Sequence, residues 1–184
     1  FFRPKVAKPP KDRRVRIWSA GCSSGMEAYS IAMTAADALP NIENWDVKIL
    51  ATDIDTNMLD HGARGVYRFD DIEDVPEGYK KRFCSRAGGP GSTEVSVADS
   101  LKSMISFKRF NFLEEDWPMQ GPFDVIFCRN VVIYFDKDFQ KILFDKFADL
   151  LKDDGLLFIG HSESLYNVTD RFDTVGRTIY QKIK

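Results

Sequence analysis

The chain has 184 residues, 43% of them hydrophobic and 29% charged, a composition typical of one globular domain with a single sizeable core. Its formal net charge of −2 argues against nucleic acid as a partner, because phosphate binding normally needs a basic surface. No apolar run is long enough for membrane insertion, and the three scattered cysteines lack metal-ligand spacing, which indicates a reducing, cytoplasmic setting without a metal site.

Residues 1–14 are predicted to be an N-terminal linker. The prolines at positions 4, 9 and 10 favour an extended chain, since proline disfavours both helices and ladder pairing. The lysines and arginines between Pro4 and Arg14 are expected to be solvated, and contact with an acidic partner is the less favoured alternative.

The next segments alternate between strand and helix. Residues 15–20 form a short apolar run with β-branched members, which predicts a buried strand. The spacing of apolar residues predicts a helix over 27–39, followed by a second strand over 47–52. Asp55 or Thr56 is expected to cap the helix after that strand.

This rhythm breaks between residue 66 and about residue 104. The stretch holds acidic and glycine-rich turns and then an alternating run over 94–98, typical of a half-exposed strand. Long loops without structure are uncommon in compact domains, so an inserted subdomain with a small antiparallel sheet is favoured over an irregular loop.

The rhythm resumes after the insert, and the closing pair of strands flanks a tight Gly-Arg turn. The predicted elements are strands over 105–110, 123–128 and 156–160, an amphipathic helix over 139–151, and hairpin strands over 171–175 and 178–182. Such alternation predicts a doubly wound, Rossmann-like α/β fold, mostly parallel, with an antiparallel hairpin at its C-terminal edge.

The loop from Gly21 to Glu27 joins the first strand to the first helix. Glycines at 21 and 25, on either side of Ser23, let the backbone turn tightly and approach a ligand. Glu27 at the helix start disfavours a pyrophosphate and favours a ligand with a positive group, such as the amino group of a methionine moiety. Taken alone, the loop is equally compatible with a ligand-binding role and with a simple strand–helix turn in which Glu27 caps the helix.

Two more polar residues follow the second and third strands. Asp53 can accept hydrogen bonds from both hydroxyls of a ribose, and Asn111 can both donate to and accept from an adenine edge. The alternatives are a helix cap for Asp53 and a turn residue for Asn111. Because ligands of parallel sheets bind at the carboxyl ends of the strands, the combination predicts a nucleoside site and S-adenosylmethionine as cofactor.

The segment after the central strand begins with Arg129 and Asn130, where the reacting group is expected. A tyrosine in an apolar run usually belongs to the core, but these neighbours favour a site role for Tyr134.

These motifs resemble the catalytic domain of the bacterial CheR-type chemotaxis receptor methyltransferases. The matching segments are 16–25, 51–55, 123–130, 133–135 and 160–163, and Phe1-Phe2-Arg3 resembles a motif that normally follows the family's helical N-terminal domain. That domain is expected to be absent here. The resemblance implies a methyltransferase domain over 15–184, with 66–104 as the β-subdomain that in some members docks a peptide at the receptor's C-terminus.

The implied reaction is methyl transfer from S-adenosylmethionine to glutamate carboxylates of the chemoreceptor, giving methyl esters and S-adenosylhomocysteine. A carboxylate with a pKa of about 4.3 needs no general base, which suits a chain with two histidines. The implied roles are Glu27 for the amino group, Asp53 for the ribose, Ile54 and Asn111 for the adenine, Asn130 and Tyr134 beside the sulfur and methyl, and Arg3 or Arg129 for orienting the glutamate. Gly21, Ser23 and Phe112 complete the expected cofactor site.

The resemblance has departures, and two alternatives stay open. Met26 and Ala28 stand where the family usually has an acid and a proline, and the segment after Arg3 is short. One alternative is a methyltransferase for another substrate, although the chain lacks the Asn/Asp-Pro-Pro-aromatic motif of many amine methyltransferases. The other is a cofactor-binding adaptor or sensor with little catalysis.

Overall fold

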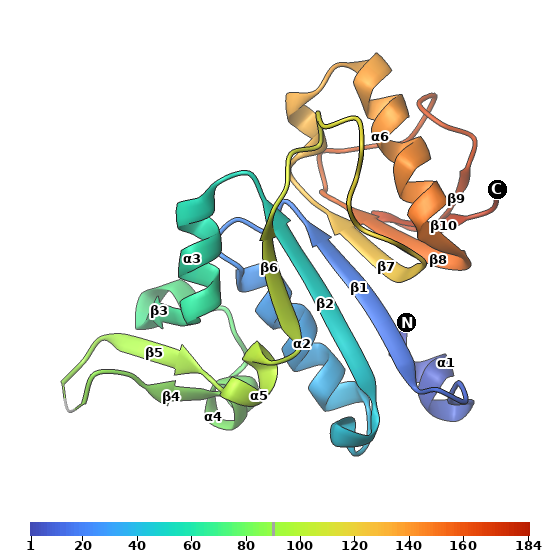
Figure 1. Cartoon of the computed structure of the whole chain (residues 1–184). Helices are drawn as coiled ribbons and strands as arrows, with labels where there is room; N and C mark the ends of the chain where they lie inside the picture. Colours follow the sequence, from blue (N-terminus) through green and yellow to red (C-terminus); the bar gives the residue numbers. More distant parts are fainter. Residues whose placement is uncertain (90) are drawn as a thin grey trace.

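A seven-stranded sheet runs through the computed structural model, which describes residues 1–89 and 91–184 (Figure 1). The strand order is β6-β2-β1-β7-β8-β10-β9. The strands are β1 (Arg14–Ala20), β2 (Asp46–Asp53), β6 (Ile105–Arg109), β7 (Phe123–Cys128), β8 (Leu151–Ile159), β9 (Phe172–Gly176) and β10 (Ile179–Lys182). The first five in this order pair parallel, whereas β10 is antiparallel to β8 and β9. The predicted doubly wound sheet with a closing hairpin is confirmed.

Helices cover both faces of the sheet. The long ones are α2 (Met26–Ala38), α3 (Thr56–Arg64) and α6 (Lys137–Leu150). From β1 the sheet grows in two opposite directions, so right-handed crossovers place α6 on the face opposite α2 and α3. Successive residues of β1 therefore enter different cores, with Ile17 packed on the α2 side and Trp18 on the α6 side.

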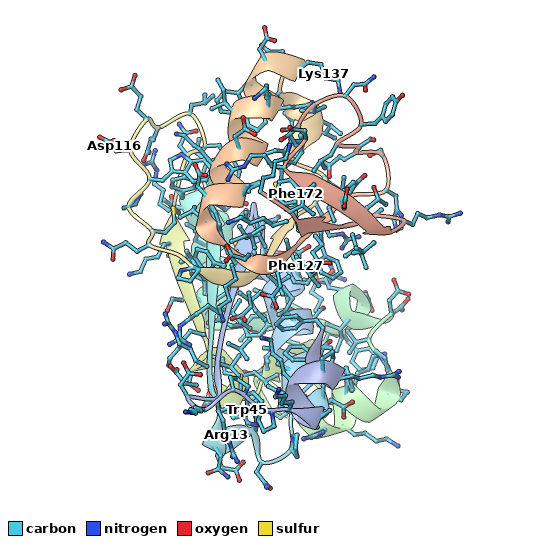
Figure 2. The ribbon with its side chains drawn as sticks, turned by 90° about the vertical axis from the view of Figure 1, so that its right-hand side faces the viewer. Arg13, Trp45, Asp116, Phe127, Lys137 and Phe172 are labelled. Carbon is cyan, nitrogen blue, oxygen red and sulfur yellow. The ribbon has the colours of Figure 1, made fainter. Side chains whose placement is uncertain are left out.

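The two ends of the sheet differ in what they carry. Figure 2 shows Arg13 and Trp45, which precede β1 and β2, at one end of the molecule, and Lys137 at the other. Lys137 starts α6 just after β7 has ended, so its end of the molecule is the one where the carboxyl ends of the parallel strands lie.

The insert forms the expected antiparallel sheet, with β5 between β3 and β4. Its elements are β3 (Val66–Arg68), the 3₁₀ helix η2 (Phe69–Ile72), α4 (Glu77–Phe83), β4 (Cys84–Arg86), β5 (Glu94–Val97) and α5 (Asp99–Lys102). The Tyr67 hydroxyl donates to the Ser24 carbonyl oxygen at 2.7 Å. This bond fastens the insert to the loop after β1.

Two expectations for secondary structure are wrong. The stretch from Pro4 onward is not wholly extended, because α1 spans Phe2–Ala7. Pro4 is tolerated there since it lies in the first turn, where backbone N–H groups have no acceptor within the helix. The strand expected from residue 156 begins at Leu151, directly after α6, and includes Gly155.

Buried charge fastens α1 to the sheet. Asp124 accepts hydrogen bonds from Lys5 Nζ (2.8 Å), Lys152 Nζ (2.7 Å) and the backbone N–H of Arg16 (2.8 Å). These groups come from α1, β7, β8 and β1, near the amino ends of the strands.

Among the described residues, no helix is long and apolar enough to cross a membrane.

Candidate cofactor and active site

A pocket of about 580 Å³ lies at the carboxyl ends of the parallel strands. Most of the predicted site residues line it, namely Gly21, Ser23, Asp53, Ile54, Asn111, Phe112, Arg129, Asn130 and Tyr134. Asp53 is the last residue of β2, and the others come from the loops after β1, β2, β6 and β7. Residues that are far apart in the sequence thus meet where the strand-end rule places a ligand.

The loop after β1 leaves no room for a side chain at Gly21. This residue has a φ of +83°, and a Cβ atom there would collide with Cγ2 of Val131. The N–H groups of Gly21 and Cys22 both donate to the Thr52 carbonyl oxygen at 2.8 Å. Bare backbone therefore forms this wall of the pocket, as close approach to a ligand requires.

Asp53 is oriented by the backbone around it. Its Oδ2 accepts from the Ser23 N–H at 2.7 Å, and its Oδ1 accepts from the Asp55 N–H at 3.1 Å. Asp55 is itself the cap of α3, accepting from the Asn57 N–H at 2.8 Å. Asp53 is therefore not needed as a cap, and its oxygens keep acceptor capacity for ligand hydroxyls.

Asn111 combines a turn role with a place in the pocket. Its Oδ1 accepts from the Leu113 N–H at 3.1 Å, so the side-chain NH₂ is the part suited to a ligand. Phe112 packs against Phe110 and Trp18 in the core below. Across the pocket, Ile54 is 57% exposed, an apolar surface against which a flat ring can pack.

Glu27 lies at the start of α2, beside this pocket. Its Oε1 accepts from Ser19 Oγ at 2.7 Å, and its Oε2 lies 3.6 Å from Arg129 Nη1. Burial raises the pKa of Glu27 above its ordinary value, against the opposing effects of the Ser19 hydroxyl and the Arg129 guanidinium. The acid is thus already held between a hydroxyl and a cation.

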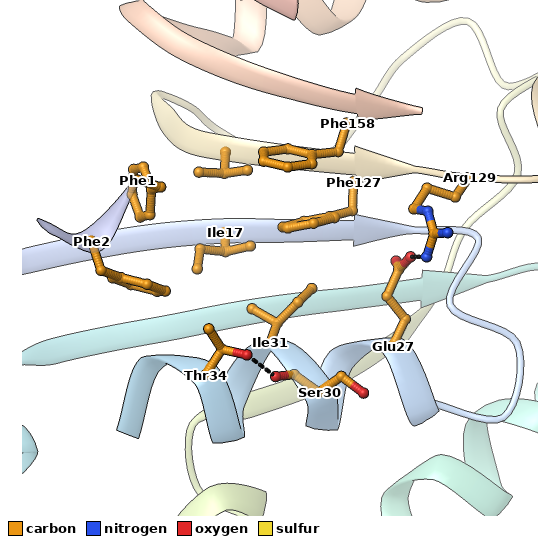
Figure 3. Close-up of a pocket in the computed structure, with 11 residues that line it drawn as sticks. Phe1, Phe2, Ile17, Glu27, Ser30, Ile31, Thr34, Phe127, Arg129 and Phe158 are labelled. Carbon is orange, nitrogen blue, oxygen red and sulfur yellow. Dashed lines mark hydrogen bonds and ion pairs between the residues drawn. The ribbon is translucent and has the colours of Figure 1, made fainter. Parts of the chain in front are cut away.

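A second pocket, of about 370 Å³, runs along the sheet face beside α2. Figure 3 shows Glu27 and Arg129 at one end of it, Phe1 and Phe2 at the other, and the stacked rings of Phe127 and Phe158 along its side. Arg129 lines both pockets and therefore lies at the point where they meet.

Arg3 is not brought to this site. It is exposed on α1 and lines neither pocket. The physical reason is the anchoring of α1 at the amino ends of the strands, where its Lys5 pairs with Asp124. The structure therefore does not bring Arg3 together with the other predicted site residues, and its place near the methyl donor stays a prediction.

Sequence reasoning missed two residues that hold the loop after β7. Glu163 accepts hydrogen bonds from backbone N–H groups of that loop, and Gln140 donates to its carbonyl oxygens. The only sequence signal for Glu163 was its place in the Gly-His-Ser-Glu segment at 160–163, and Gln140 had none.

The model of the family "CheR methyltransferase, SAM binding domain" matches residues 2–181. The chain belongs to this family. Membership confirms the expected family and S-adenosylmethionine as the cofactor.

Curated relatives agree with this membership. The chain is 44% identical to "Chemotaxis protein methyltransferase 2" of Pseudomonas aeruginosa, over 92% of this chain and 60% of the relative. It is 43% identical to "Chemotaxis protein methyltransferase" of Salmonella typhimurium, over 98% of this chain and 65% of the relative. The chain thus spans about three fifths of the length of these relatives. Among solved structures, the DszA carbon methyltransferase matches 86% of this chain and 31% of its own, with a TM-score of 0.54 and 17% identity, which shows the fold alone.

The residues of the strand-end pocket fit this cofactor. A side chain at Gly21 would close one wall, Asp53 presents a carboxylate already oriented by backbone N–H groups, and Ile54 leaves apolar surface exposed. A nucleoside needs a close backbone wall, a hydrogen-bond acceptor for its ribose hydroxyls and an apolar surface for its base, and this pocket offers all three.

Proposed function

We propose that this domain transfers a methyl group from S-adenosylmethionine to glutamate side-chain carboxylates of chemotaxis receptors, forming glutamate methyl esters. The observation that carries the proposal is the strand-end pocket, where Asp53, Asn111, Asn130 and Tyr134 lie together with Arg129 in a chain of the CheR family. The names of the curated relatives, chemotaxis protein methyltransferases, support the receptor as the substrate.

Each side of the pocket has a part in holding the cofactor. Asp53 accepts hydrogen bonds from the ribose hydroxyls, and Asn111 donates its NH₂ group to the polar edge of an adenine that packs on Ile54. Gly21, Ser23 and Phe112 shape the walls around them. When bound, the cofactor supplies a methyl group on a positively charged sulfur, beside Asn130 and Tyr134.

The acceptor glutamate needs alignment more than activation. Its carboxylate, with an ordinary pKa of about 4.3, is ionised at neutral pH, so no general base is required. The protein has to orient the carboxylate and exclude water from the site. Arg129 suits the first task, because a guanidinium can bind a carboxylate through two parallel hydrogen bonds. Tyr134 borders the same space.

Glu27 couples the two substrates in this proposal. Its Oε2 lies 3.6 Å from Arg129 Nη1, so this carboxylate would be shared between the guanidinium and the ammonium group of a bound cofactor. If Glu27 held that ammonium group, Arg129 would be free to orient the incoming glutamate.

The insert at 66–104 is proposed to dock the receptor's C-terminal peptide in receptors that carry one. In support, β4 pairs with β5 alone within its sheet, so its other edge can receive an extended peptide. A cleft of about 590 Å³ beside it is lined by Lys80, Lys81 and Arg86 and equally by Asp70, Glu77 and Glu94, so it offers charges of both signs to a peptide. We propose a cytoplasmic location for this activity, in keeping with the reducing setting that the scattered free cysteines indicate.

Methyl transfer from radiolabelled S-adenosylmethionine to receptor-enriched membranes tests the proposal. Label that is released by base supports a glutamate ester. Base-stable label would instead indicate a methyltransferase for another kind of group. Calorimetric binding of the cofactor without any transfer would support the adaptor alternative.

A further inference from the structure

The carboxylate of Glu163 lies between the carboxyl ends of β7 and β8 and is 9% exposed. Its Oε1 accepts from the N–H groups of Val131 (2.9 Å) and Val132 (2.8 Å). Its Oε2 accepts from the N–H groups of Asn130 (3.1 Å) and Gly160 (2.6 Å). One side chain thus satisfies three consecutive amides of the loop after β7 and one amide at the end of β8.

The same loop is held from its other side by Gln140 of α6. The Gln140 Nε2 donates to the carbonyl oxygens of Val132 (3.0 Å) and Phe135 (2.9 Å). Asn130 in this loop has a φ of +60°, in the left-handed region, which asparagine adopts more readily than most side-chain-bearing residues but still at some cost in energy. Glu163 and Gln140 therefore define where the loop sits relative to the sheet.

We propose that Glu163 is a positioning residue for methyl transfer, acting through the loop that carries Arg129, Asn130 and Tyr134. This inference rests on the proposed function, because those three residues line the strand-end pocket. The side chain of Glu163 does not line that pocket itself. Its effect on the cofactor is transmitted by the backbone it binds.

An ionised carboxylate is the group that this position requires. Its two oxygens each accept two N–H groups, whereas an amide offers one such oxygen and turns an NH₂ group against the other two donors. The space between Gly160, Asn130 and Glu163 is also filled, because a Cβ atom at Gly160 would lie 2.6 Å from Asn130 Oδ1 and 2.8 Å from Glu163 Oε2. The substitution Glu163→Gln therefore displaces the loop with little change in volume.

The test compares Glu163→Gln with Asp124→Asn, which alters a second buried carboxylate near the amino ends of the strands. We expect Glu163→Gln to weaken S-adenosylhomocysteine binding, measured by calorimetry, about tenfold or more, because two buried donors lose their acceptor. In transfer assays its KM for S-adenosylmethionine rises and kcat falls. Asp124→Asn lowers the melting temperature but leaves the affinity of the folded protein unchanged.

The opposite pattern would overturn the inference: a lower melting temperature for Glu163→Gln, with unchanged affinity and unchanged KM, indicates a purely structural role. Hydrogen exchange on the unmodified protein gives a test that needs no folded variant. The amides of Asn130, Val131 and Val132 should exchange as slowly as those of β7, and rapid exchange contradicts the proposal. If the unmodified protein fails to bind S-adenosylhomocysteine, the proposed function falls, while the exchange result still decides whether Glu163 holds the loop.

Discussion

Glu27 Oε2 and Arg129 Nη1 lie 3.6 Å apart, joining the first turn of α2 to the loop after β7. The contact brings together the residue proposed for the cofactor's amino group and the residue proposed for the acceptor carboxylate. Because Arg129 lines both pockets, a substitution at Glu27 that changes the position of Arg129 alters the lining of both pockets.

The substitution Glu27→Gln should weaken S-adenosylhomocysteine binding about tenfold or more, because a charge-assisted hydrogen bond to the ligand's ammonium group is lost. Isothermal titration calorimetry at neutral pH measures the effect. Glu43→Gln is the matched control, since Glu43 is exposed on the short turn η1 (Ile42–Asn44). Equal affinities for the two variants would remove Glu27 from the cofactor site.

Binding should also depend on pH through Glu27. Burial raises the pKa of this carboxyl, and the ligand's ammonium group binds its ionised form. The affinity is therefore fully present above that raised pKa and declines as the pH falls through it. A calorimetric pH series should show the decline in the unmodified protein and a flatter profile in Glu27→Gln. Parallel profiles would mean that another group titrates.

Tyr134→Phe should retain cofactor binding but slow methyl transfer about tenfold, the effect of losing one hydrogen bond in the transition state. Tyr134 is 80% exposed, so no large change in stability is expected. Steady-state turnover at saturating substrate, together with S-adenosylhomocysteine affinity, separates the two effects. Unchanged turnover would show that the Tyr134 hydroxyl takes no part in methyl transfer.

Gly21→Ala should lower the free energy of unfolding by about 2 kcal/mol, because the new methyl group meets Val131 and the residue must keep a positive φ. Urea denaturation measures the loss. The double variant with Val131→Ala should recover only part of it, since the backbone strain persists. Full recovery would show that the collision alone matters, and no recovery would show that the strain alone does.

Asp124→Asn should cost about 2 kcal/mol of stability at neutral pH, less than for a fully buried pair because both lysines keep part of their hydration. Burial acts to raise the pKa of Asp124, but hydrogen bonds from Lys152 and Lys5 lower it below its ordinary value. Its contribution is thus present above the ordinary aspartate pKa of about 3.9 and is lost as the pH falls through the lowered one. Denaturation midpoints between neutral and acidic pH should show a smaller acid loss in the variant.

Local patterns sufficed for much of the fold. Apolar runs of strand length and helical spacing predicted the alternating elements, and the strand-end rule then brought Asp53, Asn111 and Asn130 to one pocket. These predictions succeed because burial on both faces of a parallel sheet leaves near-continuous apolar runs in the strands, whereas burial on one face leaves apolar residues at helical spacing in the covering helices.

Tertiary contacts decided the rest. The prolines predicted an extended chain, yet Pro4 is tolerated in the first turn of α1, and the ion pair between Lys5 and Asp124 stabilises this helix. Two residues so far apart in the sequence give no local signal. The same contact holds α1, which carries Arg3, near the amino ends of the strands. The sequence did not predict a role for Glu163 in the site, because its hydrogen-bond partners are backbone N–H groups, which every sequence contains.

The buried carboxylates of Asp124 and Glu163 lie near opposite ends of the central sheet and hold different parts of the chain in place. Asp124 fastens α1 and the strands near their amino ends, whereas Glu163 shapes the ligand-facing loop at the opposite end. Thermal robustness and cofactor recognition can therefore vary independently. Laboratory evolution for heat tolerance would find acceptable changes around Asp124, and a selection for altered cofactor analogues would act around Glu163.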